Sequence, residues 1–299
     1  MFLGVDIGGT KTAVCLGTQD GRVLEKIRFE TTTLDETVKN IIDAGKKLAA
    51  DKNIKAIGIS CGSPQDSKKG IIQEPPNLPG WVDVPIVQIL EDAFHVPAFL
   101  ANDANACALA EWKYGAGRGT ENMIFLTFGT GMGAGLILNG KLYAGTCGMA
   151  GEVGHMRLTP DGPEGYGKTG SFEGYCSGGG IVRLGQTMGY EYATTKDICD
   201  GAKAGDEQAK KIITESATRL GQGLAILIDL FNPQKIVIGS IFARAENLFR
   251  PKMEEILKKE CLSCNLQACT VVPAQLGEAI GDMAALSVGV IGWEDMQHV

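Results

Sequence analysis

A turn with two glycines near the start of the chain constrains the fold most. The segment 2–7 is mostly apolar and carries one acid, Asp6, before Gly8 and Gly9, and the segment 13–16 is again apolar. Two apolar strands joined by a tight glycine turn form a β-hairpin. Backbone N–H groups in such a turn also form a concave site for an anion, since glycine lets the anion approach closely. The pattern leaves two interpretations open: an ordinary hairpin, or a phosphate-binding turn with Asp6 beside a divalent metal.

The composition is typical of a globular protein from the cytoplasm. The 299 residues suffice for one large or two ordinary domains, and 44% of them are hydrophobic. The net charge is −7 without a Lys/Arg-rich block, which argues against nucleic acid or an anionic membrane as the main partner. The first residues lack the basic segment of a signal peptide, and no apolar run reaches transmembrane length. Nine scattered cysteines favour a reduced, cytoplasmic chain.

The opening order of strand, glycine turn, strand, tight turn and strand occurs a second time. The two sets of strands are expected at residues 2–7, 11–18 and 22–31, and at residues 123–128, 134–138 and 141–144. We call residues 8–10 the first glycine turn and residues 129–133, which contain Gly129, Gly131 and Gly133, the second glycine turn. A repeated topology of this kind predicts two related halves.

The remaining periodicity predicts alternating helices and strands, which is typical of α/β layering. Helices are expected at residues 34–51, 85–94, 103–112, 207–231, 245–260 and 280–291, and further strands at 55–60, 96–101, 235–238 and 269–272. Residues 145–180 are rich in glycine and are expected to form an irregular functional loop. We expect a small N-terminal domain of residues 1–116, joined by the C-terminal helix 280–299, and a larger domain of residues 117–279.

Two further stretches match phosphate-binding patterns but lack the required context. Gly129, Gly131 and Ala134 fit a loose dinucleotide fingerprint that needs a helix next, whereas residues 136–138 read as a strand. Residues 162–169 satisfy the P-loop pattern, which needs a strand before it and a helix after it. A Pro-Asp-Gly turn precedes this stretch and closely spaced glycines follow it. We interpret both matches as coincidental.

Asn102 and Asp103 follow a predicted strand and begin a predicted helix. Both residue types are favoured as helix N-caps, so a purely structural role is one interpretation. In open α/β sheets, however, ligands bind beyond the carboxyl ends of the strands, where these residues lie. Transfer of a phosphoryl group to a hydroxyl needs a carboxylate that accepts the hydroxyl proton. We favour a functional role for Asp103.

Taken together, these motifs resemble those of the ROK family of sugar kinases, in the actin-like, ribonuclease-H-like ATPase class. The matching stretches are residues 6–11, 129–133 and 151–155, and the similarity continues to Gly239. The resemblance implies an α/β fold in which two actin-like domains with mixed sheets flank a cleft. It implies transfer of the γ-phosphate of ATP to a hexose hydroxyl, with Mg²⁺ as a second cofactor. It also implies a small-molecule sugar substrate and a homodimer or homotetramer.

The resemblance assigns roles to individual residues. Those implied for ATP and Mg²⁺ are Asp6, Gly8, Gly9, Thr10, Lys11, Gly129, Thr130, Gly131 and Gly239. Those implied for the sugar are Gly62, Asn77, Asn102, Asp103, Glu152, His155 and Glu173. Asp103 would be the catalytic base, Asp6 would position Mg²⁺ through water, and Gly239 would lie near the adenosine.

One departure from the family pattern concerns metal. Many members hold a structural zinc ion with the histidine at position 155 and three cysteines. Alignment on Glu173 places Glu164, Tyr166 and Ser171 at the three cysteine positions. We therefore predict that the chain has no structural zinc. We interpret Cys261, Cys264 and Cys269 as incidental, because no second Cys-x-x-Cys pair or nearby histidine accompanies them.

The sequence constrains the identity of the acceptor sugar less than it constrains the type of reaction. The stretch 77–81, which ends in Trp81, resembles glucokinase-like members, so glucose is the expected acceptor. The alternatives are N-acetylmannosamine, allose or fructose kinases. Another alternative is a sugar-sensing transcription regulator of the same family. Such regulators carry a DNA-binding helix-turn-helix before the kinase-like region, whereas here the first strand is expected to begin at residue 2. A non-catalytic sugar-binding protein is disfavoured by the presence of Asp103.

Overall fold

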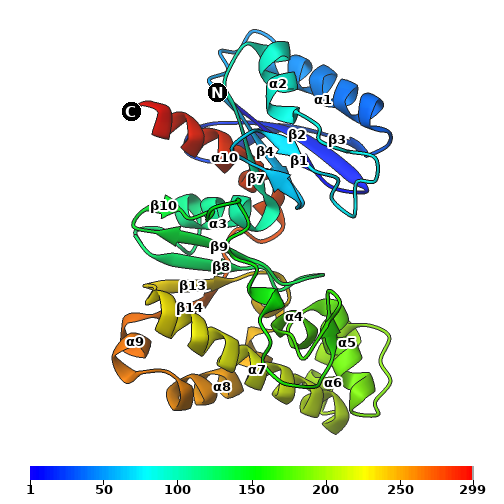
Figure 1. Ribbon diagram of the computed structural model, residues 1–299, viewed down its shortest axis with the longest axis vertical. Helices are drawn as coiled ribbons and strands as arrows, with labels where there is room; N and C mark the ends of the chain where they lie inside the picture. Colours follow the sequence, from blue (N-terminus) through cyan, green and yellow to red (C-terminus); the bar gives the residue numbers. More distant parts are fainter. Residues whose placement is uncertain (298–299) are drawn as a thin grey trace. The chain divides into compact units, whose positions relative to one another are not determined.

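The computed structural model describes residues 1–297 and contains two compact units (Figure 1). Unit 1 comprises Met1–Arg118, Leu142–Ala150 and the described residues from Leu276 onward, and unit 2 comprises Gly119–Lys141 and Gly151–Gln275. The domain boundaries that we expected after residues 116 and 279 stay predictions. Residues 298 and 299 of the expected C-terminal helix lie outside the described residues.

The sheet of unit 1 has five strands in the order β3-β2-β1-β4-β7. These strands are β1 (Phe2–Ile7), β2 (Lys11–Gly17), β3 (Val23–Glu30), β4 (Ala56–Cys61) and β7 (Ala98–Asn102). The pairs β1–β2 and β2–β3 are antiparallel, whereas β1 pairs with β4 and β4 with β7 in parallel. The carboxyl ends of β1, β4 and β7 therefore meet at one edge of the sheet. A short hairpin of β5 (Gln65–Asp66) and β6 (Ile71–Ile72) follows β4.

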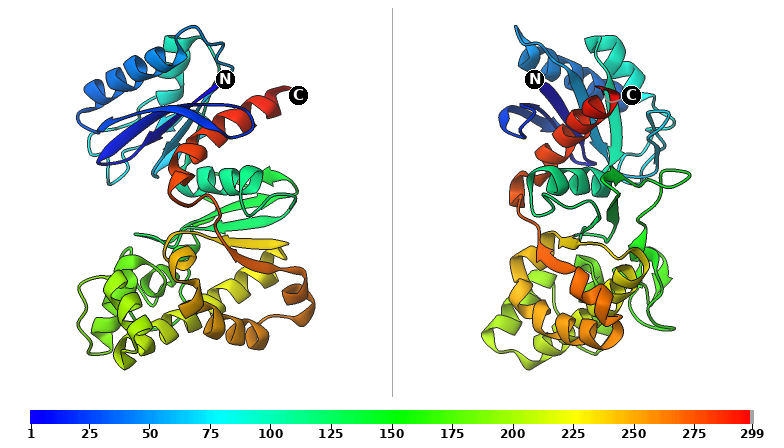
Figure 2. Two further views of the ribbon diagram at one scale, coloured as in Figure 1. Left: turned by 180° about the vertical axis from the view of Figure 1, so that it is seen from behind. Right: turned by 90° about the vertical axis from the view of Figure 1, so that its left-hand side faces the viewer.

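Helices cover both faces of this sheet. Leu3, Val5 and Ile7 share a core with residues of α1 (Leu34–Ala49) and α2 (Ile86–Phe94), whereas Phe2 packs with Leu286 of α10 (Ile280–Gln297). Figure 2 shows α10 running along the sheet. Because side chains alternate between the two faces of a strand, Asp6 lies on the face that α10 covers. The fourth helix of this unit, α3 (Asp103–Tyr114), begins directly after β7.

Glycines let α10 approach the sheet closely. A Cβ atom added at Gly58 of β4 would collide with the carbonyl oxygen of Ala285, and one added at Gly4 of β1 would lie 2.8 Å from the backbone nitrogen of Leu286. The small residues therefore fix how near the start of α10, which contains Gly281 and Asp282, lies to the end of β1.

The sheet of unit 2 repeats this topology with the order β10-β9-β8-β13-β14. Its strands are β8 (Met123–Leu126), β9 (Ala134–Leu138), β10 (Lys141–Leu142), β13 (Lys235–Ile238) and β14 (Thr270–Pro273). As in unit 1, the first pair is antiparallel, and the strands on the other side of β8 are parallel to it. The predicted duplication is confirmed. Since β9 and no helix follows the second glycine turn, the dinucleotide interpretation is excluded.

The helices of unit 2 gather beside its sheet (Figure 1). They are α4 (Phe172–Tyr175), α5 (Gly178–Thr187), α6 (Thr195–Ala204), α7 (Glu207–Phe231), α8 (Ser240–Glu260) and α9 (Ser263–Ala268). The prediction that residues 145–180 are irregular was partly wrong, because this segment contains the 3-10 helix η1 (Val153–His155), α4 and the start of α5. The sequence analysis also missed α6.

The glycines at the start of α5 explain that error. Glycine disfavours helix, and Gly178, Gly179 and Gly180 are consecutive. Ser177 offsets this cost as the N-cap, because its hydroxyl accepts a hydrogen bond from the N–H of Gly180 at 3.0 Å. Burial of Ile181 then holds the helix in place.

The P-loop-like stretch 162–169 forms a small hairpin. Its strands are β11 (Glu164–Gly165) and β12 (Lys168–Thr169), which pair in antiparallel orientation. No strand directly precedes the motif, and its Lys168 and Thr169 lie in β12, whereas in a P-loop they begin a helix. The prediction that the match is coincidental is confirmed.

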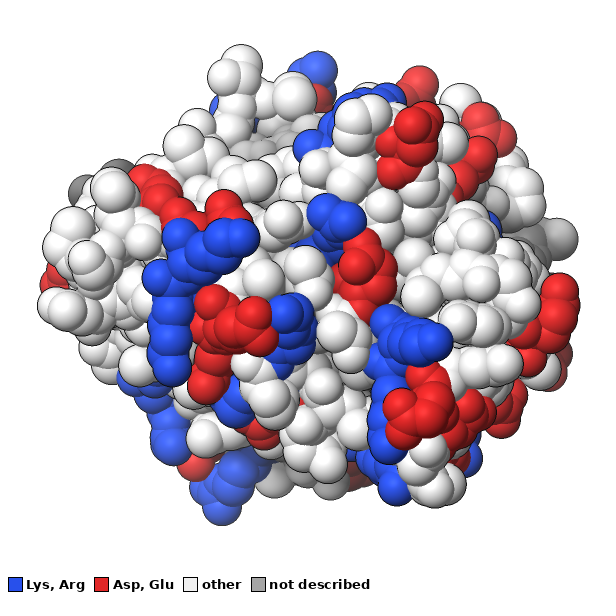
Figure 3. Space-filling model, turned by 90° about the horizontal axis from the view of Figure 1, so that it is seen from below, with Lys and Arg blue, Asp and Glu red and all other residues white. Residues whose placement is uncertain are grey.

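Acidic and basic side chains are interspersed on the face that Figure 3 shows. Several of the surface pairs are one helical turn apart, as in Lys196–Asp200, where Nζ and Oδ2 are 2.5 Å apart. Such pairing leaves no large patch of a single sign on this face. Among the described residues, no helix has both the length and the apolar character that crossing a membrane requires.

Candidate functional site

In unit 1, chemically active side chains gather at the edge where the parallel strands end. Asp6 of β1 lies opposite Ser60 of β4, and Cys61 lies opposite Asn102 of β7. Asp103 follows as the first residue of α3. Parallel pairing therefore brings together two acids that are 97 positions apart in sequence.

The first glycine turn is held by a residue that the sequence analysis did not single out. Thr31, directly after β3, donates its hydroxyl to the Gly8 carbonyl at 2.6 Å and its N–H to the Thr10 carbonyl at 3.0 Å. The N–H of Gly8 donates to the Lys11 carbonyl at 3.1 Å. Thr10 and Lys11 themselves are exposed. The turn thus has a fixed shape and polar groups available to a ligand.

The same turn contacts the loop that contains the expected sugar residues of unit 1. A Cβ added at Gly9 would collide with the Asn77 carbonyl, so this approach requires glycine. A Cβ added at Gly62 would lie 3.4 Å from Asn77 Oδ1. The structure therefore brings Gly9, Gly62 and Asn77 together. Trp81 is 1% exposed, which identifies it as a core residue that anchors this loop.

The Asp6 carboxyl group is destabilised in its charged form. Burial raises its pKa to about 6, and the negative charges of Asp282 and Asp103 add to this effect, against smaller opposing contributions from Lys26 and Arg28. Asp282 is paired with Lys26 at 2.7 Å. A carboxylate in this position gains strongly from a bound cation.

Asp6 fits Mg²⁺ better than a metal with an all-protein ligand set. The described residues contain no cluster of three or more His, Cys, Asp or Glu side chains arranged to hold a metal. Mg²⁺ commonly keeps several waters and binds through one or two carboxylates plus substrate phosphates. One buried acid at the end of the strand that leads into the first glycine turn is consistent with that arrangement.

Asn102 and Asp103 differ in burial and in hydrogen bonding. Asn102 is 6% exposed and is the N-cap of α3, because its Oδ1 accepts from the N–H of Asn105 at 2.8 Å. Asp103 is exposed, and its Oδ1 accepts from the N–H of Ala104 at 2.9 Å. Although its side chain keeps contact with water, desolvation by the surrounding protein raises the pKa of Asp103, while the backbone hydrogen bonds act in the opposite direction.

One buried amide near this point was also missed by the sequence analysis. Asn105 is 2% exposed, and its Oδ1 has no hydrogen-bond partner in the described part of the chain. Buried polar atoms are nearly always paired with protein or water. The spacing Asn-x-x-Asn at positions 102 and 105 is a signal that could have identified it.

In unit 2, hydrogen bonds hold the second glycine turn and the end of the strand before it. Its Gly129 N–H donates to the Gly131 carbonyl at 3.1 Å, and the Gly129 carbonyl accepts from the N–H of Gly178 at 2.7 Å. Gly239, at the end of β13, donates its N–H to Leu126 at 2.9 Å. The structure thus places Gly239 and the start of α5 beside this turn, while Thr130 stays exposed.

The expected sugar residues of unit 2 lie next to the same turn. Glu152 precedes η1, His155 is its last residue, and both are exposed. Glu173 on α4 accepts a hydrogen bond at its Oε2 from the N–H of Met132 at 3.0 Å. A Cβ added at Gly154 would collide with the Met132 carbonyl. These contacts join η1, α4 and the second glycine turn.

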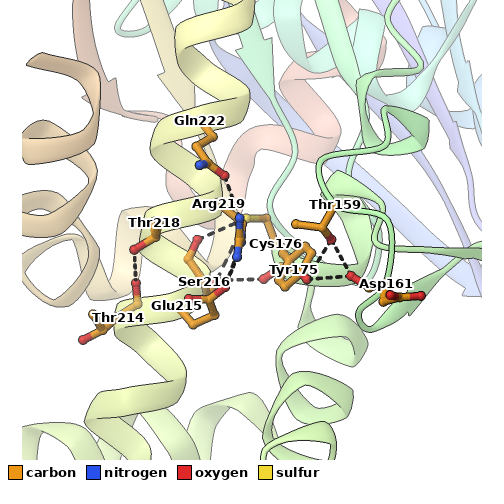
Figure 4. A network of polar contacts seen from close by, with 10 residues as sticks. All are labelled: Thr159, Asp161, Tyr175, Cys176, Thr214, Glu215, Ser216, Thr218, Arg219 and Gln222. Atoms are coloured by element: carbon orange, nitrogen blue, oxygen red, sulfur yellow. Dashed lines mark hydrogen bonds and ion pairs between the residues drawn. The ribbon is translucent and has the colours of Figure 1, made fainter. Parts of the chain in front are cut away.

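A network of polar contacts joins Tyr175, the last residue of α4, to the preceding loop and to α7 (Figure 4). The Tyr175 hydroxyl lies 2.9 Å from Thr159 Oγ1 and 3.3 Å from the Asp161 carbonyl oxygen. The Tyr175 carbonyl accepts from the Ser216 hydroxyl of α7 at 2.7 Å. The Arg219 guanidinium lies 5.2 Å from the centre of the Tyr175 ring. The loop that precedes Glu173 is thereby tied to the long helix α7.

The residues at the three zinc-cysteine positions lie in different surroundings. Ser171 is fully buried and acts as the N-cap of α4, accepting from the N–H of Gly174 at 3.1 Å. Tyr166 is 79% exposed, and Glu164 is exposed. Lys168 instead donates to the His155 carbonyl at 2.7 Å. A neutral capping hydroxyl and an exposed phenol are poor ligands for Zn²⁺; the absence of structural zinc stays a prediction that metal analysis tests.

Comparison with known proteins identifies the family. The family model described as "ROK family" matches residues 2–288. The chain belongs to the ROK family. It is 35% identical over 275 residues to the glucokinase of Halalkalibacterium halodurans, covering 84% of this chain and 83% of that protein. It is 35% identical over 249 residues to the N-acetylmannosamine kinase of an Escherichia coli strain, covering 82% of this chain and 84% of that one.

A solved structure of the family supports the fold. The ROK glucokinase of Streptomyces griseus, crystallised with glucose and AMPPNP, is 30% identical and superimposes with a TM-score of 0.75, covering 96% of this chain and 98% of that one. The predicted membership of the ROK family and the actin-like α/β fold with two mixed sheets are confirmed.

Proposed function

We propose that this protein is an ATP-dependent hexose kinase whose acceptor is glucose. One observation carries the proposal: Asp103, an exposed carboxylate with a raised pKa, lies at the same sheet edge as Asp6 and the first glycine turn. This edge offers a base, a charge that favours a cation, and backbone groups suited to phosphate. Kinase chemistry needs these three functions. Membership of the ROK family supports the same activity.

In the proposed reaction, Asp103 accepts the proton of the attacking sugar hydroxyl. The hydroxyl oxygen forms a bond to the γ-phosphorus as the bond to the oxygen bridging the β- and γ-phosphorus breaks, and ADP leaves with that bridging oxygen. The raised pKa makes the Asp103 carboxylate a stronger proton acceptor than a free aspartate. Asp6 would hold Mg²⁺ through water. When bound, Mg²⁺ neutralises charge on the transferring phosphate.

The binding roles follow the two glycine turns and the loops beside them. In unit 1, Gly8, Gly9, Thr10 and Lys11 hold phosphate, and Gly62, Asn77 and Asn102 contact the sugar. In unit 2, Gly129, Thr130 and Gly131 hold phosphate, Gly239 lies near the adenosine, and Glu152, His155 and Glu173 contact the sugar. Polar groups placed for sugar hydroxyls discriminate against analogues that lack them, because the protein groups would stay unpaired.

A screen of acceptors tests the proposal. ADP release is measured by a coupled assay with ATP, Mg²⁺ and each of glucose, mannose, fructose, allose, N-acetylglucosamine and N-acetylmannosamine. We expect the highest kcat/KM with glucose. The second candidate is N-acetylmannosamine, because a relative with that name is 35% identical. A higher kcat/KM with N-acetylmannosamine would select that function, and no stimulation of ATP turnover by any sugar would exclude a kinase of these hexoses.

A further inference from the structure

The Glu173 carboxylate makes a direct hydrogen bond to the second glycine turn. Its Oε2 accepts from the N–H of Met132 at 3.0 Å, and a Cβ added at Gly131 would lie 2.9 Å from the same oxygen. Met132 is 4% exposed, so its N–H is hidden from solvent and depends on a protein acceptor. Glu173 therefore satisfies a backbone donor in the middle of a turn that is proposed to hold phosphate.

The neighbours of Glu173 hold the other groups of the same turn. Gly154 lies against the Met132 carbonyl, and its added Cβ would lie 3.3 Å from Glu173 Cβ. A few residues beyond Glu173, the N–H of Gly178 donates to the Gly129 carbonyl at 2.7 Å. All these contacts lie within unit 2. The turn thus receives its shape from η1, α4 and the start of α5, which also present His155 and Glu173.

We propose that Glu173 is a positioning residue for the nucleotide: its carboxylate fixes the backbone of the second glycine turn and so sets the affinity for ATP before any sugar binds. This inference rests on the proposed kinase function and adds a second task to a residue expected to contact sugar. One carboxylate can perform both, because it accepts several hydrogen bonds. The hydrogen bond from the Met132 N–H needs only an acceptor oxygen, but the negative charge of the Glu173 carboxylate makes this bond stronger.

Three variants separate the positioning role from sugar contact. Glu173→Ala removes the acceptor, Glu173→Gln keeps an acceptor oxygen without the charge, and Glu164→Ala removes an exposed carboxylate from the neighbouring hairpin as a control. The AMPPNP Kd without sugar is measured by calorimetry, and the ATP KM is measured at saturating glucose. We expect Glu173→Ala to raise both by about five- to twentyfold, Glu173→Gln by less than threefold, and Glu164→Ala by less than twofold.

The outcomes distinguish this inference from the proposed function. If Glu173→Ala raises only the glucose KM and leaves the AMPPNP Kd and the ATP KM at their wild-type values, Glu173 has no positioning role while the kinase assignment stands. If the wild-type protein binds neither AMPPNP nor sugar and turns over no ATP, the kinase assignment itself fails. Equal losses in Glu173→Ala and Glu173→Gln would also overturn the inference, since the Gln side chain retains the acceptor. Thermal unfolding of each variant verifies that it is folded.

Discussion

Asp6 is a residue whose proposed function opposes the stability of the fold. Its pKa of about 6 means that the folded chain holds a proton on this carboxyl group between about pH 4 and 6, where the unfolded chain has released it. Raising the pH through that window therefore lowers the free energy of unfolding, by up to about 3 kcal/mol from this group. Above pH 6 the charged form of Asp6 and its energetic cost are both present, and this charged form is the state that we propose binds Mg²⁺.

The first prediction concerns the charge of Asp6. Asp6→Asn keeps the size of the side chain and removes its charge, so we expect this variant to be more stable than wild type at pH 7.5, by about 1–3 kcal/mol. The difference should shrink towards pH 4.5, where Asp6 is mostly protonated. The free energies of unfolding at pH 7.5 and pH 4.5 are measured by urea unfolding in the absence of Mg²⁺ and nucleotide. Asp20→Asn serves as the control, because hydrogen bonds lower the pKa of Asp20 and its loss should not stabilise. Lower stability of Asp6→Asn than of wild type at pH 7.5 would contradict the argument.

The second prediction concerns the proposed base. In Asp103→Asn, the residue still fits the first position of α3 but no longer accepts a proton. We expect kcat/KM to fall by about 10²- to 10⁴-fold, with the glucose Kd changed less than about threefold. Steady-state kinetics and calorimetry give the two values. Asp295→Asn, an exposed position on α10, is the matched control. Near-normal turnover by Asp103→Asn would show that another group accepts the proton.

At the scale of elements, several side-chain hydrogen bonds hold the segment from η1 to α4. Ser171 caps α4, Lys168 holds the His155 carbonyl, and Tyr175 joins the loop to α7. Hydrogen bonds between neutral groups contribute about 1 kcal/mol each, so several of them together are needed to order such a loop.

The third prediction tests this support. Tyr175→Phe removes the hydroxyl that lies near Thr159 and Asp161, at a cost of about 1 kcal/mol. Since the loop presents His155 and Glu173, we expect the glucose KM to rise about three- to tenfold, with a smaller change in kcat. Steady-state kinetics at saturating ATP measures both. Tyr166→Phe, at an exposed tyrosine of the same loop, should keep wild-type constants. An unchanged glucose KM in Tyr175→Phe would mean that the hydroxyl does not order the site.

At the scale of the whole molecule, the buried acid Glu111 binds two segments of unit 1. Each segment lies next to a point at which the chain passes from one unit to the other. Glu111 of α3 is fully buried, and its Oε2 accepts from the N–H of Ala116 at 2.8 Å while its Oε1 accepts from the N–H of Leu276 at 2.9 Å. Ala116 lies just before the passage at residues 118 and 119, and Leu276 just after the passage at residues 275 and 276. A single carboxylate therefore fixes the start of one connection and the end of another.

The fourth prediction follows from the two acceptor oxygens of Glu111. Glu111→Gln keeps one acceptor and replaces the other with an NH₂ group, which faces a backbone N–H and cannot bond it. A buried donor left unpaired costs about 1–3 kcal/mol, so the free energy of unfolding should fall by that amount. Urea unfolding at pH 7.5 measures it, with Glu191→Gln, an exposed position, as the control. Equal stability of Glu111→Gln and wild type would mean that the carboxylate is not required at these connections.

The local sequence pattern was sufficient to predict many helices and strands and both glycine turns. The apolar segment before Asp6, the Gly8-Gly9 pair and the long helix ending at Asn232-Pro233 are determined by neighbours in sequence, and the structure has them within one or two residues. The helix α5 was missed because its three glycines oppose helix locally, and the Ser177 cap with burial of Ile181 outweighs that preference. The tasks of Thr31 and Glu111 were missed for a related reason, since a hydroxyl and an acid gain them only from distant partners.

The sequence by itself determined the chemistry available to this protein: the residue types in the two glycine turns, the acids at positions 6 and 103, and the family to which their order points. Only the tertiary structure decided how each group is used. Parallel pairing of β1, β4 and β7 placed the two acids at one edge and raised the pKa of Asp6 through burial. Packing of α4 against the second glycine turn gave Glu173 a backbone partner. Burial and distance set these properties, and they depend on contacts between residues far apart in the chain.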